Sequence, residues 1–401
     1  LVGPWGHHYP DQGHPGPALG FQQISLEWWD HWLKPGAAAP RWPRLRAWLR
    51  EFDPPQDALD RRNGRWIETP TPASCTGSDV VHLCAKGLSP AAPKRAGGWP
   101  LPDDLTIGEA AGDTGYFGRS GGLPLDQRQD DAHSLTFDSE PLGQDVVLLG
   151  ATIAALHLCS DAQPAQVSLR LNDVAPDGRS ARVCMAVRNL ALDARLDAPD
   201  ARASTTSEVA IPFPAVAYRF RKGHRIRLSV ASSYWPLVWP SPDTRRIELK
   251  RGSLVLPVFR GSPTDLQAPL PPALDLPEVK THHATATNPI ERFHRKADDG
   301  ERISGWIQPF SELHYTETGT AFGYETRAEH RIVPGQPTSA SSAFDHRARY
   351  SRPDGTAAIR CSVAARCDAH AFFVEGEFGA DWENERVAEH RWTVSIPRRH
   401  S

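Results

Sequence analysis

Residues 134–260 alternate apolar and polar side chains with a period of two, and this pattern constrains the fold more than any other feature of the chain. The clearest runs are residues 167–172, 183–187 and 225–230. Turn residues such as Pro176-Asp177-Gly178 separate them. Period two is the spacing of a strand with one buried face, and several such strands between turns indicate antiparallel sheets. We therefore predict a mainly β chain built around a β-sandwich over residues 41–262, with jelly-roll connectivity.

Shorter signals place further strands in this region. Residues 46–50 and 80–84 are β-compatible, and Trp66 follows an Asn63-Gly64 turn. Residues 146–158 are almost continuously apolar, which predicts one central strand buried on both faces. Residues 86–133 are rich in Gly, Pro and Asp, which predicts a long ordered loop.

Residues 1–40 differ in character from the sandwich. The first residues resemble the end of a buried strand running into a Pro-Trp-Gly-His-His loop, and they lack an initiator Met and the basic and apolar regions of a signal peptide. Phe21, Ile24, Trp28 and Trp32 then recur at helical spacing before Pro35-Gly36. Strand, loop and helix form one step of an α/β fold, and we expect the tryptophans to pack against a large neighbour. We also expect that a preceding part of the protein is missing from this chain.

The C-terminal part is predicted to be a separate β region. The segment 263–299 is rich in proline at its start, which predicts a semi-rigid linker. Residues 300–401 contain strand signals at 313–333, 349–361, 371–374 and 392–396, with a Pro353-Asp354-Gly355 turn. This region is predicted to be a β-rich C-terminal extension.

Composition excludes several classes of function. The hydrophobic fraction is 39%, the charged fraction 23% and the formal net charge −3, as in ordinary soluble proteins. This charge gives no reason to expect nucleic acid as a partner, and no apolar run is long enough to cross a membrane. No cofactor motif is present, and we expect no cofactor.

The cysteines are too sparse for a disulfide scaffold. We expect free thiols in a reducing compartment, which favours the cytoplasm, with Cys75 and Cys84 as the pair to consider if a disulfide forms. The six are Cys75, Cys84, Cys159, Cys184, Cys361 and Cys367.

Three features are candidates for chemistry. His7 lies on a loop after a predicted strand, where α/β folds place their sites, and a histidine can act there as general base. Gly118-Arg119-Ser120-Gly121-Gly122 matches the G-x-S-x-G pattern, but it lacks the strand-to-helix context, so Ser120 is predicted to lie in a glycine-rich loop. A metal set can be drawn from His7, His8, Asp11 and His14, but adjacent strand residues point to opposite faces, so we predict no metal site.

Several motifs together resemble the X-Pro dipeptidyl-peptidase and cocaine-esterase family of α/β-hydrolases. The resemblance covers roughly residues 1–260. It is carried by the Pro4-Trp5-Gly6-His7 loop, the helix segment 25–34, the segments 123–131, 135–142, 170–178 and 222–228, and the Trp235-Pro236 and Trp239-Pro240 pairs.

The resemblance implies a serine hydrolase that cleaves amide or ester bonds with a Ser-His-Asp triad and an oxyanion hole. His7 matches the catalytic histidine, residues 1–40 match the end of an α/β-hydrolase domain, and the nucleophile and acid would precede Leu1. This chain alone is therefore expected to be inactive. The implied substrate is a peptide or small-molecule ester or amide, and a homodimer is expected. The alternative from another class is a non-catalytic, galactose-binding-like β-sandwich that acts in binding or assembly.

Overall fold

A computed structural model describes most of the 401 residues of the chain. The described residues are 1–36, 45–69, 76–113, 121–160, 166–190, 205–243, 246–261, 264–265, 270–274, 281–283 and 290–398. They fall into two compact units. Unit 1 comprises 1–103, 110–233 and 245–275, and unit 2 comprises 104–109, 234–244 and 276–401. No helix in the described residues is long and apolar enough to span a bilayer.

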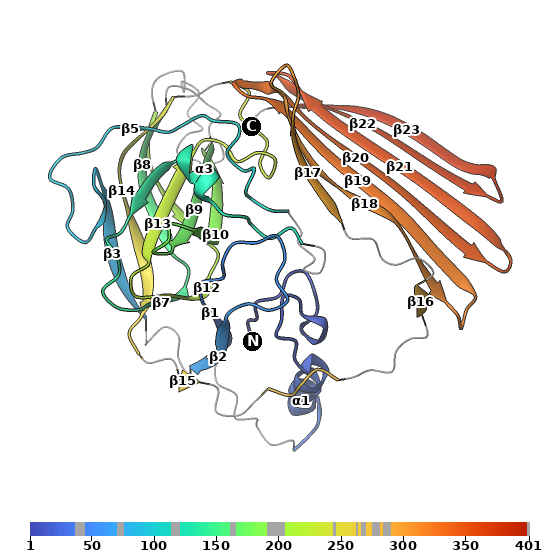
Figure 1. The fold of residues 1–401 in the computed structure, drawn as a ribbon, viewed down its shortest axis with the longest axis horizontal. Coiled ribbons are helices and arrows are strands. Elements are labelled where there is room, and N and C mark those ends of the chain that lie inside the picture. The colour runs from blue at the N-terminus through green and yellow to red at the C-terminus, as the bar shows by residue number, and fades with distance from the viewer. Residues whose placement is uncertain are drawn as a thin grey trace. The chain divides into compact units, whose positions relative to one another are not determined.

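In the described part of unit 1, strands predominate over helices (Figure 1). Its helical elements are η1 (Pro10–Gln12), α1 (Phe21–Leu33) and α3 (Arg128–Ala132). Its strands up to β8 are β1 (Leu45–Arg50), β2 (Gly64–Thr69), β3 (Thr76–Cys84), β4 (Gly87–Ser89), β5 (Trp99–Pro100), β6 (Leu135–Asp138), β7 (Val146–Gly150) and β8 (Ile153–Ser160). The remaining strands are β9 (Gln166–Val174), β10 (Ser180–Asn189), β11 (Thr205–Pro212), β12 (Val216–Phe220), β13 (Arg225–Ala231), β14 (Ile247–Phe259) and β15 (Thr264–Asp265).

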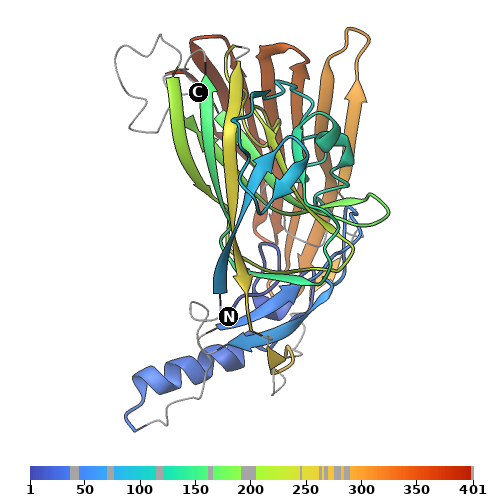
Figure 2. The ribbon, with the colours of Figure 1, turned by 90° about the vertical axis from the view of Figure 1, so that its left-hand side faces the viewer.

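Two sheets share the core of unit 1. The larger follows the order β11-β8-β14-β7-β12-β1-β2-β15, with β3, β4 and β5 attached beside β14, and the smaller is β10-β9-β13-β6. Alternate residues of both sheets enter one cluster, for example Leu156 and Leu254 from the larger sheet and Leu169 and Leu228 from the smaller. Figure 2 shows the long strands of this unit in side view. The alternation in the sequence thus arises from two sheets that each bury one face.

The apolar segment 146–158 is not one strand, which corrects the sequence prediction. Gly150 has φ of +132° and ends β7, and the chain resumes as β8 at Ile153. Both strands hydrogen-bond to β14, but at different parts of its length. β8 also alternates between exposed and buried residues, so only one of its faces is in the core.

Helix α1 has the expected bounds but not the expected environment. It ends before Gly36, whose φ is +77°. None of its residues is buried, and Trp32 is 63% exposed. The part of the chain that the structure describes does not bury these tryptophans, so their packing against a large neighbour stays a prediction. Local periodicity defines an apolar face without defining what covers it.

Unit 2 is built on one antiparallel sheet of eight strands. The order is β16-β18-β19-β20-β21-β22-β23, with β17 also paired to β18. Its strands are β16 (Thr281–His283), β17 (Glu291–Lys296), β18 (Arg302–Tyr315), β19 (Thr320–Val333), β20 (Gln336–Arg352), β21 (Gly355–Cys367), β22 (Ala371–Trp382) and β23 (Glu385–Pro397). The sheet therefore begins at β16 and β17, inside the segment 263–299 that the sequence predicted as a linker.

The sheet of unit 2 has one apolar and one charged face. Residues directly opposite each other share a face. One row across the strands is apolar, and it runs through Trp392, Gly376, Val363, Phe344, Ala328 and Trp306. The adjacent row is polar and charged, and it runs through Arg391, Glu377, Ser362, Asp345 and Arg327. Part of the apolar face is covered by a small core that includes Leu105 and Trp235 from the two short segments of this unit.

The described cysteines are free thiols. They are Cys84, Cys159, Cys184, Cys361 and Cys367. Cys75, the partner considered for Cys84, lies outside the described residues, and Cys84 itself forms no disulfide.

Candidate functional site

The loop that carries His7 is held to unit 1 by backbone hydrogen bonds on both sides. Val2 N–H donates to Arg46 O at 2.8 Å, and Trp48 N–H donates to Val2 O at 2.9 Å. Gly6 N–H donates to His14 O at 3.0 Å. Val2 forms only an isolated parallel bridge, and Leu1 and Val2 are exposed, so the buried strand predicted here is not present.

Trp5 is the anchor of this loop. Its indole Nε1 donates a hydrogen bond to Pro17 O at 2.7 Å, and its ring lies 6.0 Å from that of Trp66. A Cβ added to Gly3 or Gly13 would lie only 2.3 or 2.1 Å from the Trp5 ring. Only glycine fits this close approach at either position, so the sequence Gly-Pro-Trp fixes the path of the chain up to His7.

His7 is exposed, whereas its neighbour His8 is partly buried. Asp11 and His14, the other two residues of the metal set considered and rejected from the sequence, lie on the same loop. Asp11 accepts a hydrogen bond from Gln22 of α1 at 2.7 Å, and His14 accepts one from Gly6 through its backbone oxygen. Within the ranges that the structure describes, no group of three or more His, Cys, Asp or Glu residues is placed to hold a metal ion.

Ser120 lies outside the described residues, but the glycines after it are described. Gly121 and Gly122 have φ of +81° and +93°, values at which L side chains are strained. Gly122 N–H donates to Asp57 Oδ1 at 2.9 Å, and Leu123 N–H donates to Asp57 O at 2.9 Å. The residues that follow Ser120 therefore form a glycine loop that is hydrogen-bonded to Asp57, and not a helix.

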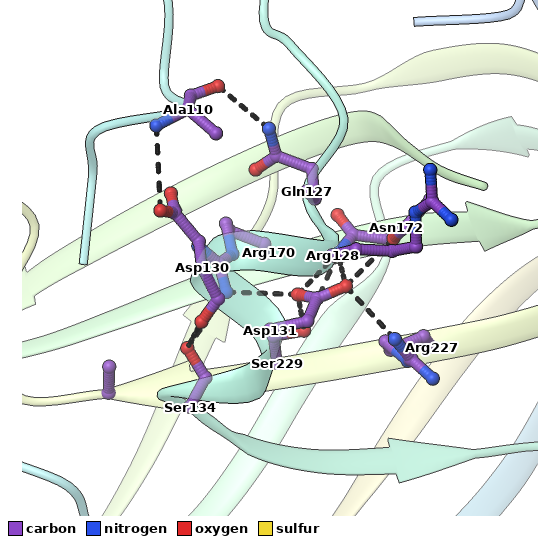
Figure 3. Close-up of polar contacts among 12 residues, drawn as sticks. Ala110, Gln127, Arg128, Asp130, Asp131, Ser134, Arg170, Asn172, Arg227 and Ser229 are labelled. Carbon is purple, nitrogen blue, oxygen red and sulfur yellow. Dashed lines mark hydrogen bonds and ion pairs between the residues drawn. The ribbon is translucent and has the colours of Figure 1, made fainter. Parts of the chain in front are cut away.

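The most highly connected polar site of the described residues surrounds Asp131, at the end of α3 (Figure 3). Five side chains donate hydrogen bonds of 2.7 to 3.1 Å to its carboxylate: Arg170, Asn172, Ser180, Arg227 and Ser229. Arg170 also pairs with Asp130 at 3.1 Å, and Arg227 pairs with Asp138 at 2.6 Å. Asp131 is 5% exposed and Arg170 is 2% exposed.

This cluster joins three sequence motifs that are far apart in the chain. Asp131 belongs to segment 123–131, Arg170 and Asn172 to segment 170–178, and Arg227 to segment 222–228. A buried charge is tolerated only when it is paired and hydrogen-bonded, and here every carboxylate faces a guanidinium. Hydrogen bonding to Asp138 raises the pKa of Arg227 above its ordinary value despite its burial. The cluster therefore attaches α3 to β9 and β13, and its charged groups are buried and paired with one another.

A second buried cluster, formed by Asp173, Tyr218 and His224, connects segment 170–178 to segment 222–228. His224 Nδ1 lies 2.8 Å from Asp173 Oδ1, and the Tyr218 hydroxyl donates to Asp173 Oδ2 at 2.9 Å. Burial raises the pKa of the Asp173 carboxyl, which its hydrogen bond to His224 opposes. Burial also raises the pKa of Tyr218. Asp173 and His224 stand inside the motif segments 170–178 and 222–228, but no local sequence pattern predicts that their side chains meet.

Two hollows in unit 1 are large enough to hold a ligand. One of about 270 Å³ is lined by residues that include Arg50, Asp53, Cys184 and Tyr218. Burial raises the pKa of the Cys184 thiol to about 12, so this sulfur stays protonated and is a poor nucleophile. The other, of about 650 Å³, lies on the outer face of β8, β11 and β14.

Comparison with known proteins extends the resemblance. Residues 66–289 match the model of the X-Pro dipeptidyl-peptidase C-terminal non-catalytic domain. Cocaine esterase of Rhodococcus sp. (strain MB1 Bresler) is 30% identical over 186 residues, which are 42% of this chain and 32% of that protein. The match thus spans about a third of the length of this relative.

Two solved structures of hydrolases are similar to part of this chain. An alpha-amino acid ester hydrolase has a TM-score of 0.47 and 18% identity, over 64% of this chain and 50% of that chain. An aminopeptidase from the marine sediment archaeon Thaumarchaeota archaeon has a TM-score of 0.46 and 16% identity, over 59% of this chain and 44% of that chain. The family model covers more than half of the sequence, and this chain belongs to the X-Pro dipeptidyl-peptidase and cocaine-esterase family.

Proposed function

We propose that this chain is the C-terminal part of a serine hydrolase that cleaves amide or ester bonds, and that His7 is the histidine of its Ser-His-Asp triad. The observation that carries the proposal is the Gly3-to-Gly13 loop, in which Trp5 is anchored while His7 remains exposed. An anchored loop with an exposed imidazole is the arrangement needed by a histidine that serves a reacting group from another part of the protein.

In this mechanism His7 takes the proton of a serine hydroxyl as the serine attacks the carbonyl, and then returns it to the leaving group. An aspartate would hold the imidazole in the correct tautomer. The serine and the aspartate would come from outside these 401 residues.

The test is hydrolysis of p-nitrophenyl acetate and of an X-Pro p-nitroanilide by the protein as its source makes it, with an intact mass measured first. His7→Ala should lower kcat by about 10³-fold or more, as loss of a triad member does. His8→Ala is the matched control and should change kcat by less than about fivefold, because His8 has no role in the proposed triad. An unchanged kcat in His7→Ala would contradict the assignment.

The 401-residue chain expressed alone should not hydrolyse either substrate. Turnover by this chain that disappears in Ser120→Ala would show that the glycine-loop serine is a nucleophile, and the proposed division of the triad would then be wrong.

A second candidate is a non-catalytic β-sandwich of the jelly-roll, galactose-binding-like kind that acts in binding or assembly. It is favoured by the description of the matched family model as non-catalytic and by the 650 Å³ hollow on unit 1. Lack of hydrolysis by the native protein, with a native mass equal to the 44.2 kDa of this chain, would favour this candidate.

A further inference from the structure

Strand β23 is a long edge strand at the end of the sheet of unit 2 (Figure 1). It has 13 residues and pairs with β22 on one side, and no described strand pairs with its other side. All of its residues except Trp392 are exposed, including Val394 and Ile396. A long strand edge with unpaired N–H and C=O groups and exposed apolar side chains is a template for another strand.

The charges on this edge complement a second copy of the same edge. Glu389, His390 and Arg391 follow one another, so an acid and a base stand on either side of a histidine. When two β23 strands run antiparallel around a twofold axis perpendicular to the sheet, one residue lies opposite its own copy, and the axis passes between these two copies. An axis at His390 places Glu389 of each copy opposite Arg391 of the other.

Other registers use these charges less well. An axis at Glu389 or Arg391 would set that residue opposite its own copy, and like charges directly opposite each other are destabilising. An axis at Trp392 would leave Arg391 opposite Thr393 and would pair no charges. The register between β22 and β23 shifts at a bulge at Val387. Regular pairing of β23 with a second copy would therefore end at Ala388 on the N-terminal side of the axis.

We propose that two copies of this chain associate edge to edge through β23, in antiparallel register with the twofold axis at His390. Arg391 already contacts Glu377 and Glu389 of its own chain at 3.2 Å, so its side chain lies on the charged face next to the new edge. Pairing would continue both faces of the sheet into the partner copy. The row of Trp392, Gly376 and Val363 would thereby extend across the junction. This inference does not depend on the proposed catalytic role.

The first test is the solution mass of the full chain by light scattering, from about 1 to 100 µM. The wild type should form a species of twice 44.2 kDa. Glu389→Arg and Arg391→Glu each set like charges opposite each other twice, and each should weaken dimerisation about tenfold or more. The double variant E389R/R391E restores both opposite-charge pairs and should restore the dimer. A wild type that stays monomeric at 100 µM, or single variants that dimerise as well as the wild type, would overturn the proposal.

The second test determines the register. His390→Cys places two thiols at the axis, where opposite residues of an antiparallel pair lie within disulfide reach. Oxidation should give a covalent dimer on a non-reducing gel, beyond the background from the native thiols of the wild type. Val387→Cys is the matched control, because its two copies would lie about 20 Å apart along the strands. A covalent dimer with Trp392→Cys and none with His390→Cys would overturn the register. Circular dichroism should show that every variant remains folded.

Discussion

Units 1 and 2 both pair arginine with acidic side chains, but the Asp131 cluster of unit 1 is buried, whereas many pairs of unit 2 lie on an exposed sheet face. In unit 1, Asp131 of α3 and Arg170 of β9 are almost completely buried, on the face of the smaller sheet that α3 covers. In unit 2, pairs such as Arg347 with Glu325 lie on the open charged face of one sheet, with side chains 71% and 42% exposed. Buried pairs are costly to break because a charge is left without water, whereas water replaces a lost partner at the surface. The buried arginine–aspartate cluster should therefore be essential for the fold of unit 1, whereas the exposed arginine–glutamate pairs should contribute little to the stability of unit 2.

The largest expected effect is the loss of the Asp131 carboxylate. Asp131→Ala removes the shared acceptor of five donors, and Arg170 and Arg227 keep only Asp130 and Asp138 as acidic partners. We expect the variant to lower the free energy of unfolding by about 3–5 kcal/mol, as breaking a buried ion pair does. Urea denaturation, followed by hydrogen exchange in residues 166–190, measures this change. The matched control is Asp177→Ala, which removes an exposed carboxylate 2.7 Å from Arg179 and should leave the free energy of unfolding nearly unchanged. Equal losses in the two variants would remove the distinction between buried and exposed pairs.

A smaller effect is expected on the stability of unit 2 when the pH is lowered. Hydrogen bonds from Arg386 and Arg360 lower the pKa of Asp381 below its ordinary value of 3.8. Because the folded form holds the carboxylate deprotonated, this stabilisation is fully present above pH 3.8 and is lost as the pH falls through the lower pKa of the folded state. Asp381→Asn should therefore make the stability of unit 2 less dependent on pH below 3.8. Hydrogen exchange of β21 and β22 between pH 2.5 and 5 measures this. A pH dependence identical to that of the wild type would contradict the role of Asp381.

The smallest effect is expected at the exposed pair of Arg347 and Glu325, 3.2 Å apart. Arg347→Ala should lower the free energy of unfolding by less than about 1 kcal/mol, and added salt should reduce the difference further. Thermal unfolding at two salt concentrations measures both effects. A loss as large as that of Asp131→Ala would show that the charged face of unit 2 stabilises the fold as strongly as a buried cluster.

Much of the local structure could be predicted because it depends on neighbouring residues. The period-two runs predicted β9, β10 and β13, and the helical spacing from Phe21 to Trp32 predicted α1. Turn residues such as Pro353-Asp354-Gly355 predicted the β20–β21 hairpin. The family was also recognised from motifs, and the comparisons confirmed it. The role of His7 and the jelly-roll connectivity stay predictions.

Only the tertiary structure decided which distant residues meet. Asp131 contacts Arg170 and Arg227, which are 39 and 96 residues away, and no local pattern contains that information. The division of residues 146–158 into two strands depends on where each part pairs with β14. The short segments 104–109 and 234–244 pack in unit 2, although their sequence neighbours belong to unit 1. Side-chain periodicity follows from the geometry of one strand or helix, whereas such contacts depend on chain closure and burial over long separations.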